Sequence, residues 1–418
     1  MTHSETLPQL IQEASRCVAC GLCVPHCPTY RKTQSEADSP RGRIALIKGV
    51  LEQRIPLGDK FIQHIDLCLT CRACEAVCPS GVRYGRLVDG VRPLIKRGPR
   101  GWREAMHKSM LRKVLPDATR LRWLGGALRF YQYSGVQAWA RRSGLLERLG
   151  VAGLERELPP LPPTQSWRTV YPASGPVRGE VGMFLGCVAR LVDVETLNAT
   201  IFVLNRLGYT VHVPKTQTCC GALHQHDGEV GMAATLARRN IDAFAQAMPV
   251  LSAASGCGAW LSEYPLAVGD EAVDFAGRVM DVNAFLAQAA GWDKVEIQRL
   301  AAKIAVQDAC TLRNVLRQNS SPYALLQRIP QAEIVALPGN GQCCGAAGNY
   351  HLEQPAMAGA LLGDKIAAIE ASAPRYLATA NIGCALWLAQ GLREKGMDIE
   401  VVHPVTLLAR QMGFTGTC

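Results

Sequence analysis

Two cysteine runs near the start of the chain have the spacing of iron–sulfur ligands. Each run reads C-x2-C-x2-C-x3-C-P; the first is Cys17, Cys20, Cys23, Cys27 and Pro28, and the second is Cys68, Cys71, Cys74, Cys78 and Pro79. In runs of this kind three thiolates hold one 4Fe-4S cluster, and the fourth thiolate belongs to the other cluster. The pattern therefore predicts cluster one on Cys17, Cys20, Cys23 and Cys78, and cluster two on Cys68, Cys71, Cys74 and Cys27. Zinc does not explain the pattern, because a structural zinc site stops at four ligands.

Further cysteines recur as two similar sets in the C-terminal half of the chain. The first set is Cys187, Cys219, Cys220 and Cys257, and the second set is Cys310, Cys343, Cys344 and Cys384. Corresponding cysteines are 123 to 127 residues apart, and each set contains the motif Cys-Cys-Gly. Four thiolates could hold a third and a fourth iron–sulfur cluster. The alternative is that one or both sets are merely buried thiols, which behave as small hydrophobic side chains.

The elements that must position these cysteines can be inferred from the apolar pattern. Residues 41–54 and 60–66 are helical in pattern and lie between the two N-terminal runs, and Arg41 and Arg43 begin the first of these helices. In each C-terminal copy an apolar strand runs towards a cysteine (residues 181–187 and 304–310), and a second strand follows (residues 210–213 and 333–336). Strands that alternate with helices predict parallel α/β layers. Their cysteines then lie where strands end and helices begin, which favours anionic thiolates.

The predicted fold is an α+β multidomain chain: an N-terminal all-helical two-cluster ferredoxin module followed by two repeated α/β CCG domains with parallel strands. The expected domains are residues 1–98 for the ferredoxin-like module, 99–180 for a basic helical segment with a Pro-rich linker, 181–300 for the first CCG domain and 301–418 for the second. Prolines between residues 158 and 180 exclude a long helix or a central strand there.

Composition limits the compartment and the kind of partner. The chain has 418 residues, 17 cysteines and 48% hydrophobic residues, so its cysteines are not needed to compensate for a small core. Residues 1–16 contain no apolar secretory segment, and no run of eighteen apolar residues occurs, so we expect a cytoplasmic protein with reduced thiols.

The net charge of +10 is concentrated in residues 92–148, where basic residues alternate with aromatic ones. A solvated helical face with its aromatics in a core is one interpretation. Docking to an anionic membrane surface or to an acidic partner is another. Nucleic acid is disfavoured, because no recognition motif accompanies the charge.

Several stretches resemble the iron–sulfur subunit family of bacterial glycolate oxidase. They are CVACGLCVPHCPTY, DSPRGRIALIKGVLE, CLTCRACEAVCPSGVRY, CCGALHQH, ASGCGAWLSEY, CCGAAGNY and TANIGC. The wider group shares CCG domains with heterodisulfide reductase, anaerobic glycerol-3-phosphate dehydrogenase and lactate-utilisation proteins. In heterodisulfide reductase the motif ends in C-x2-C, which supplies five thiolates per copy. Here Trp260 and Trp387 stand at that last position, so noncubane clusters and disulfide-reducing chemistry are in doubt.

The resemblance implies an electron-transfer subunit. A FAD-containing partner would oxidise a 2-hydroxy acid such as glycolate, and this chain would pass electrons to a quinone or another acceptor, with the membrane surface approached through residues 92–148. No G-x-G-x-x-G motif follows a strand, and no catalytic signature of its own is found. The alternatives are a heterodisulfide or thiol reductase acting at a CCG-bound cluster, and a scaffold or redox sensor whose clusters only stabilise the fold. His224 and His226 follow the first CCG motif and are candidates for a ligand or a proton donor, whereas Tyr84 shows no functional pattern.

Overall fold

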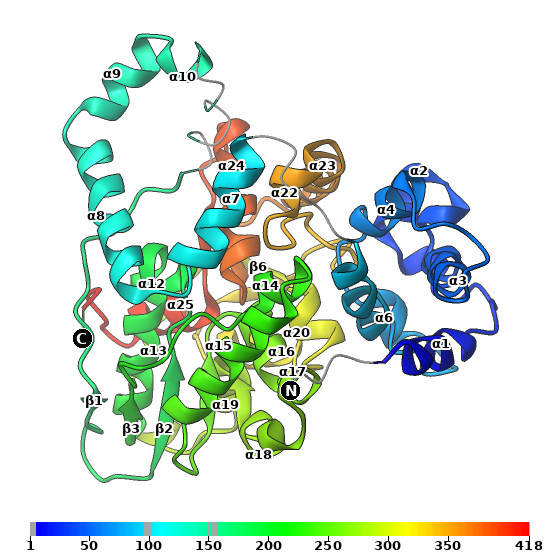
Figure 1. The fold of residues 1–418 in the computed structure, drawn as a ribbon. Coiled ribbons are helices and arrows are strands. Elements are labelled where there is room, and N and C mark those ends of the chain that lie inside the picture. Colours follow the sequence, from blue (N-terminus) through cyan, green and yellow to red (C-terminus); the bar gives the residue numbers. More distant parts are fainter. Residues whose placement is uncertain (1–5, 96–101, 149–150, 152–154, 156–157, 418) are drawn as a thin grey trace.

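The computed structural model describes residues 6–95, 102–148, 151, 155 and 158–417, and these form three parts (Figure 1). A helical module at one side of the molecule contains residues 6–95. A basic arm, residues 102–148, projects from the other side. The remaining residues form two sheets and the helices that cover them. The predicted fold class is confirmed, with a helical N-terminal module and two α/β repeats.

The helical module is built from short helices around a small apolar core. Its helices are α1 (Leu7–Ser15), α2 (Pro28–Thr33), α3 (Pro40–Leu51), α4 (Asp59–Asp66), α5 (Ala73–Ala76) and α6 (Tyr84–Val91), with 3-10 turns at Val24–His26, Glu36–Asp38 and Arg92–Leu94. Helix α3 begins where Ser39 accepts a hydrogen bond from the Gly42 backbone N–H and Pro40 occupies the first helical turn, which is a favoured way to begin a helix. Ile47, Ile65 and Leu87 are fully buried in the core.

The basic arm consists of helices that lie mostly on the surface. They are α7 (Trp102–Ser109), a π-helical turn at Met110–Val114, α8 (Ala118–Tyr133), α9 (Val136–Arg142) and α10 (Leu145–Arg148). The Pro-rich segment runs back along α8, because the Tyr133 hydroxyl donates to the Leu161 carbonyl at 2.8 Å and the Gln132 side-chain amide donates to the Pro159 carbonyl at 2.9 Å. Lys96, Arg97 and Arg100, which belong to the predicted basic region, lie outside the described residues.

The first sheet has the strand order β1-β3-β2-β4-β5. Its strands are β1 (Val170–Tyr171), β2 (Gly179–Phe184), β3 (Tyr209–His212), β4 (Val250–Ser252) and β5 (Val279–Asp281), and all pairs except β1–β3 are parallel. Its helices are α12 (Val188–Val192), α13 (Val194–Arg206), α14 (Ala222–His226), α15 (Val230–Ala243), α16 (Ser255–Ser262), α17 (Pro265–Val268), α18 (Val273–Gly277) and α19 (Val282–Gln288).

The second sheet repeats the parallel part of the first, in the order β7-β6-β8-β9. Its strands are β6 (Lys303–Gln307), β7 (Glu333–Ala336), β8 (Tyr376–Thr379) and β9 (Glu400–Val402), all of them parallel. Its helices are α20 (Cys310–Asn314), α21 (Ser321–Leu326), α22 (Tyr350–Glu353), α23 (Pro355–Ser372), α24 (Ile382–Glu394) and α25 (Pro404–Gln411).

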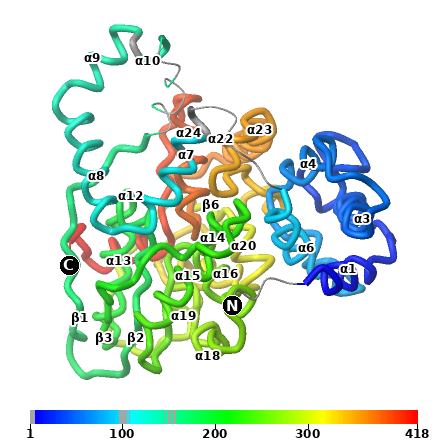
Figure 2. The backbone as a smooth tube through the Cα atoms, viewed as in Figure 1, coloured from blue at the N-terminus to red at the C-terminus, as the bar shows by residue number. Residues whose placement is uncertain are grey.

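The two sheets share one hydrophobic core. Val181 and Met183 of β2, Ile304 and Val306 of β6, and Leu408 of α25 belong to a single cluster of buried side chains. Helix α13 packs against α25, and α19 packs against α21. The chain trace in Figure 2 shows the same close association of the green and red segments. The two repeats are therefore joined by their cores and not only by the connecting chain.

Candidate functional site

The N-terminal cysteines come together in two groups, which we call site one and site two after the predicted clusters. Cys17, Cys20, Cys23 and Cys78 line one cavity, which Arg41, Tyr84 and Cys74, a predicted ligand of site two, also line. Cys20 is exposed, and its neighbours Val18 and Leu22 are 69% and 57% exposed. Site one therefore lies at the surface of the module.

Site two is more deeply placed. Cys27, Cys68 and Cys74 are buried, and Cys71 is partly exposed. Burial raises the pKa of the Cys74 thiol well above its usual value, and the neighbouring Cys71, Cys68 and Cys27 raise it further. Cys27 is thus among the neighbours of Cys74, and Cys78 lines the cavity of the first run; the division into two ligand sets stays a prediction. Buried thiols of this kind become thiolates when they bind metal, which fits an iron–sulfur cluster.

The backbone of the two runs bends in the same way. Ala19 and Thr70 occupy equivalent places, two residues after the first cysteine of each run, and their φ angles are +53° and +51°. Gly21 and Arg72, two residues further on, have φ angles of +83° and +56°. Non-glycine residues rarely adopt this left-handed region, at a cost of about 1–2 kcal/mol each. The strain lets successive cysteines turn towards one centre, and such strain is typical of functional sites.

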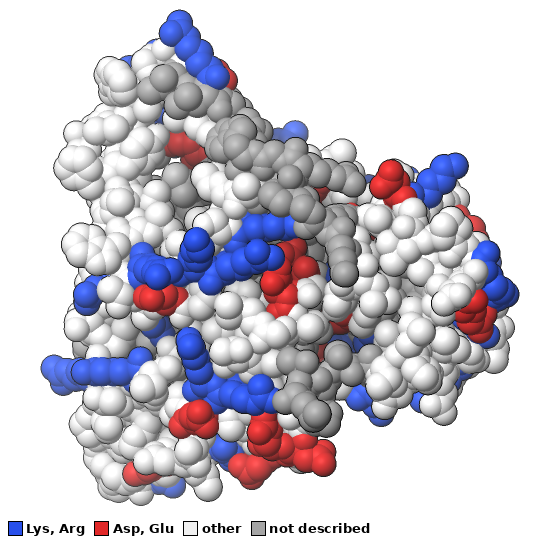
Figure 3. Space-filling model, in the orientation of Figure 1, with Lys and Arg blue, Asp and Glu red and all other residues white. Residues whose placement is uncertain are grey.

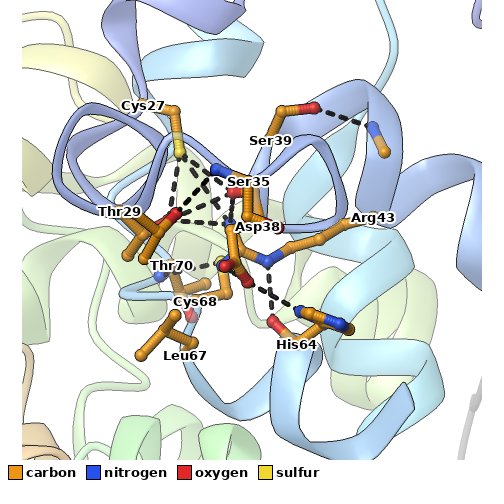
Figure 4. Close-up of polar contacts among 12 residues, drawn as sticks. Cys27, Thr29, Ser35, Asp38, Ser39, Arg43, His64, Leu67, Cys68 and Thr70 are labelled. Atoms are coloured by element: carbon orange, nitrogen blue, oxygen red, sulfur yellow. Dashed lines mark hydrogen bonds and ion pairs between the residues drawn. The ribbon is translucent and has the colours of Figure 1, made fainter. Parts of the chain in front are cut away.

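A buried arginine network lies beside site two (Figure 4). The Arg43 side chain is 1% exposed, and its guanidinium donates to Thr29 Oγ1 at 2.9 Å and to the His64 carbonyl at 2.7 Å. It also lies 3.8 Å from the Cys27 sulfur and pairs with Asp38, whose carboxylate contacts His64 Nδ1 at 2.8 Å. Arg43 therefore lies beside a predicted ligand of cluster two. Arg41 instead lines site one and pairs with Glu36 at 2.6 Å.

Tyr84 was not recognised from the sequence, yet it also reaches site two. Its buried hydroxyl donates to the Cys68 sulfur at 3.6 Å. No local pattern could have marked it, because Tyr84 begins α6 and meets Cys68 only in the folded module.

The first CCG set is brought together where β2 and β3 end and α16 begins. The sulfurs of Cys187 and Cys219 lie 3.5 Å apart, and the Gly221 backbone N–H donates to the Cys219 sulfur at 3.4 Å. Gly221 has a φ of +91°, and a Cβ there would lie 3.4 Å from the indole nitrogen of Trp260. The left-handed turn of the motif therefore favours glycine at this position.

The second CCG set has matching geometry. The sulfurs of Cys344 and Cys384 lie 3.2 Å apart, and the Gly345 N–H donates to the Cys343 sulfur at 3.4 Å. Gly345 has a φ of +93°, and a Cβ there would come within 2.7 Å of the Ala358 carbonyl oxygen. Cys310 lies in the same buried neighbourhood and raises the pKa of Cys71 of site two. Both sets thus gather four thiols through repeated elements.

Trp260 and Trp387 occupy equivalent places in the two repeats. Each lies three residues after the last cysteine of its set, and residues at this spacing share one face of a helix. Within the described residues both indole nitrogens are buried and have no hydrogen-bond partner. Such a buried donor is unusual in a protein. It suits a site that gains acceptor atoms, such as the sulfides of a cluster, when its cofactor binds.

The structure gives His224 and His226 structural partners. His224 is fully buried, and its Nε2 lies 2.9 Å from the Leu111 carbonyl of the arm. Burial lowers the pKa of His224. The Nδ1 atom of His226 contacts the Asp89 carboxylate at 3.2 Å. These contacts tie the first repeat to the arm and to the helical module, which favours a structural role over metal ligation.

None of these groups has the geometry of a ready-made single-ion site. In the part of the chain that the structure describes, no three His, Cys, Asp or Glu side chains are arranged to hold one metal ion. The thiolates of a 4Fe-4S cluster bind four separate irons, so they do not need to converge on one ion. The all-cysteine donor sets therefore fit iron–sulfur clusters better than a mononuclear metal.

Comparison with protein families matches each part of the chain. Residues 13–82 match the 4Fe-4S dicluster domain, residues 102–156 match the linker region of the glycolate oxidase iron-sulfur subunit, and residues 181–262 and 304–389 each match the cysteine-rich domain called CCG. The prediction of two N-terminal 4Fe-4S clusters is confirmed by the first match. The CCG repeat inferred from the spacing is confirmed by the last two.

Three similar proteins show how far the likeness extends. A probable glycolate oxidase iron-sulfur subunit of Bacillus subtilis (strain 168) is 35% identical over 96% of this chain and 94% of its own length. The glycolate oxidase iron-sulfur subunit of Escherichia coli (strain K12) is 34% identical over 90% of both chains. Lactate utilization protein A of Geobacillus kaustophilus (strain HTA426) is 30% identical, over 55% of this chain and 98% of its own.

Proposed function

The chain belongs to the family of glycolate oxidase iron–sulfur subunits, and on that premise we propose that it is the electron-relay subunit of a flavin-dependent 2-hydroxy-acid dehydrogenase complex. A partner subunit with FAD would oxidise a glycolate-type substrate. The electrons would leave the partner one at a time and pass through this chain to a quinone or another acceptor. Iron–sulfur clusters supply one-electron transfer over a range of potentials, which the residues of sites one and two would hold in place.

The observation that carries this proposal is the placement of two four-cysteine sites at different depths. Site one opens to the surface beside the exposed Val18 and Leu22, so a redox partner can approach it closely. Site two is buried and lies against the C-terminal repeats. A surface site followed by an interior site is the arrangement that an electron relay needs. A purely structural role would not need an exposed site.

We further propose that the CCG sets hold a third and a fourth cluster, each on four thiolates. The repeated turns at Gly221 and Gly345 and the unpartnered indoles of Trp260 and Trp387 support this proposal. The indoles also argue against the reductase alternative. A tryptophan cannot supply the fifth thiolate of a noncubane cluster. Its indole N–H can only donate a hydrogen bond to a cluster and cannot act as a ligand.

Iron analysis of the anaerobically purified complex tests this assignment. We expect about sixteen irons per chain, with a matching amount of acid-labile sulfide, because both CCG sets are loaded in addition to sites one and two; about twelve would contradict the fourth cluster. About eight irons would contradict the CCG part of the proposal.

The relay itself is tested by omitting this chain: the flavin partner alone is expected to reduce an artificial dye but not a quinone. Quinone reduction by the partner alone would overturn the relay function.

The outer surface of the basic arm supports docking to an anionic membrane. Trp123, Phe130 and Tyr133 of α8 and Trp139 of α9 are 61% to 74% exposed. The interpretation that the aromatics of this segment lie in a core is therefore wrong for these four. Figure 3 shows Lys and Arg gathered across the middle of the molecule where the arm begins, while the rim along α8 and α9 is mostly uncharged. Exposed aromatics on helices that also carry basic residues, as α8 and α9 do, are typical of helices that lie in a membrane interface.

No helix in the described ranges is long and apolar enough to span a bilayer, and we propose peripheral attachment through the arm. The variant Trp123→Ser/Phe130→Ser/Trp139→Ser should bind anionic phospholipid vesicles roughly a hundredfold more weakly, because it loses about 1 kcal/mol of interfacial burial at each aromatic. Vesicle flotation measures this. Val177→Ser, at a 66% exposed site outside the arm, is the matched control and should bind as the unaltered protein does. If the triple variant floats with the vesicles as well as the unaltered protein does, membrane docking is contradicted. If the triple variant instead fails to bind the flavin partner, the surface is assigned to that partner.

A further inference from the structure

We propose that the second CCG set (Cys310, Cys343, Cys344 and Cys384) is the direct electron-transfer neighbour of site two, and that the first CCG set is reached only through the second. This inference rests on the proposed function and adds the order in which the sites communicate. The helical module could have been placed against either repeat, because the two repeats have the same elements. The structure places site two against the second repeat (Figures 1 and 2).

Direct hydrogen bonds join site two to the second repeat. The Asn314 side-chain amide donates to the Cys71 carbonyl at 2.7 Å, and Asn314 is the last residue of α20, which begins at Cys310. The Tyr350 hydroxyl donates to the Leu67 carbonyl at 2.9 Å, one residue before Cys68. Lys32 and Asp364 add an ion pair of 2.8 Å between α2 and α23. The ligand loop of site two is thus attached to α20, whose first residue is Cys310, and to α22, which follows Cys343 and Cys344.

The space between the two sets of thiols is filled by apolar side chains. Leu69 and Cys343 belong to one buried cluster with Tyr350, and Cys71 and Cys310 pack against it. Thiols from both sites therefore pack against the same apolar cluster, which gives an electron a path through packed side chains.

The first repeat meets the helical module differently. Ion pairs join it to the module: Arg72, which follows Cys71 in the ligand loop of site two, pairs with Glu263, and Asp89 pairs with His226. Its cysteines are covered by the basic arm, since the Thr218 hydroxyl donates to the Pro116 carbonyl at 2.5 Å. These contacts fix the position of the module but place no ligand of site two against the first set.

The two CCG sets are linked to each other near their helix N-termini. The Ser255 N–H donates to the Ala380 carbonyl at 3.0 Å, and the Ser255 hydroxyl lies 2.8 Å from that of Thr311. Ser255 precedes Cys257 of the first set by two residues, while Thr311 follows Cys310 of the second. The order that results is site one, site two, second set and first set. At each transfer one electron leaves one site and enters the next, so one site is oxidised and the next is reduced, and no bond or proton needs to change.

Electron paramagnetic resonance of the reduced holoprotein tests the order, with a matched pair of variants. Cys310→Ala and Cys187→Ala remove the same position from the second and the first set. In the unaltered protein we expect site two to show magnetic coupling both to site one and to the second CCG set. Cys310→Ala should abolish the coupling to the second set while the coupling to site one remains, and Cys187→Ala should preserve both. Asn314→Leu, which keeps every cysteine, should weaken the coupling to the second set without lowering the iron content.

The reverse pattern, with coupling to the second set lost in Cys187→Ala and kept in Cys310→Ala, would overturn the inference. Absence of coupling to the second set in the unaltered protein would also overturn it. An iron content of about eight per chain would do the same, yet would leave the relay through sites one and two intact. Conversely, the protein could show the expected magnetic coupling between site two and the second set but accept no electrons from its flavin partner. That result would contradict the proposed function and leave the inferred order of the sites intact. The two failures are therefore distinguishable.

Discussion

Replacing Cys20 by alanine is expected to stop electron delivery to the quinone while leaving substrate oxidation intact. Cys20 is a predicted ligand of site one, and the loss of one thiolate should cost that cluster, or about four irons per chain. The flavin partner should still reduce an artificial dye at its normal rate, because the substrate site lies on the partner. Parallel assays with quinone and dye, together with iron analysis, measure the separation. Loss of both activities would show that the chain does more than relay electrons.

Cys74→Ala is the companion variant that separates cluster loss from loss of fold. Cys20 is exposed, whereas Cys74 is buried in the core of the helical module. Both variants should lose about four irons, but only Cys74→Ala should also lower the thermal stability of the module through a packing defect. If Cys20→Ala also unfolds the module, the loss of quinone reduction in this variant would not report on electron transfer alone. The reduction potential of site two would then have to be measured instead.

Replacing Arg43 by glutamine should lower the reduction potential of site two. The guanidinium lies 3.8 Å from the Cys27 sulfur and favours the more negative, reduced state of a cluster held there. Hydrogen bonds to charged groups contribute about 1.5–3 kcal/mol, which for one electron corresponds to a decrease of roughly 65–130 mV. The change also leaves the buried Asp38 without its cation, so the module should be destabilised by about 3–5 kcal/mol. Potentiometric titration and thermal unfolding measure the two effects.

Two further variants separate charge from packing. Arg43→Lys keeps the positive charge but cannot reproduce the planar set of contacts to Thr29, Asp38 and the His64 carbonyl. It should therefore lose stability while keeping most of the potential. Arg41→Gln, which removes a cation from site one, should leave the potential of site two unchanged. A potential that is unaltered in Arg43→Gln would refute the tuning role.

Local patterns predicted the elements that repeat or that have strong periodicity. The helix expected at residues 60–66 is α4 (Asp59–Asp66), and the strand expected at residues 333–336 is β7 (Glu333–Ala336). Strands β5 and β9 were not predicted, because each is only three residues long and too short to show alternation. The spacing of the cysteines in the sequence identified those that come together in the sites. A cluster requires its ligands at defined positions, and this requirement is visible as a pattern in the sequence.

The surroundings of the sites could not be predicted, because they depend on contacts between distant residues. Tyr84 reaches Cys68 across the module, and Asp38 and His64 meet Arg43 only when α3 and α4 pack together. The exposure of Trp123 could not be inferred either. An aromatic residue at helical spacing is usually buried, and only its 74% exposure in the folded chain shows otherwise.

The contact between the helical module and the second repeat also affects how the protein is made. The hydroxyl that caps the Leu67 carbonyl belongs to a residue 283 positions later in the chain. A ribosome adding about 5–20 residues per second needs roughly 15–60 s to synthesise that length. During this interval the second cysteine run has emerged, while the surface that will cover Leu69 and Cys71 does not yet exist. A cofactor can therefore be inserted at site two only during a limited time. This time begins when the second cysteine run has been translated, and it ends when the last quarter of the chain folds over the ligand loop.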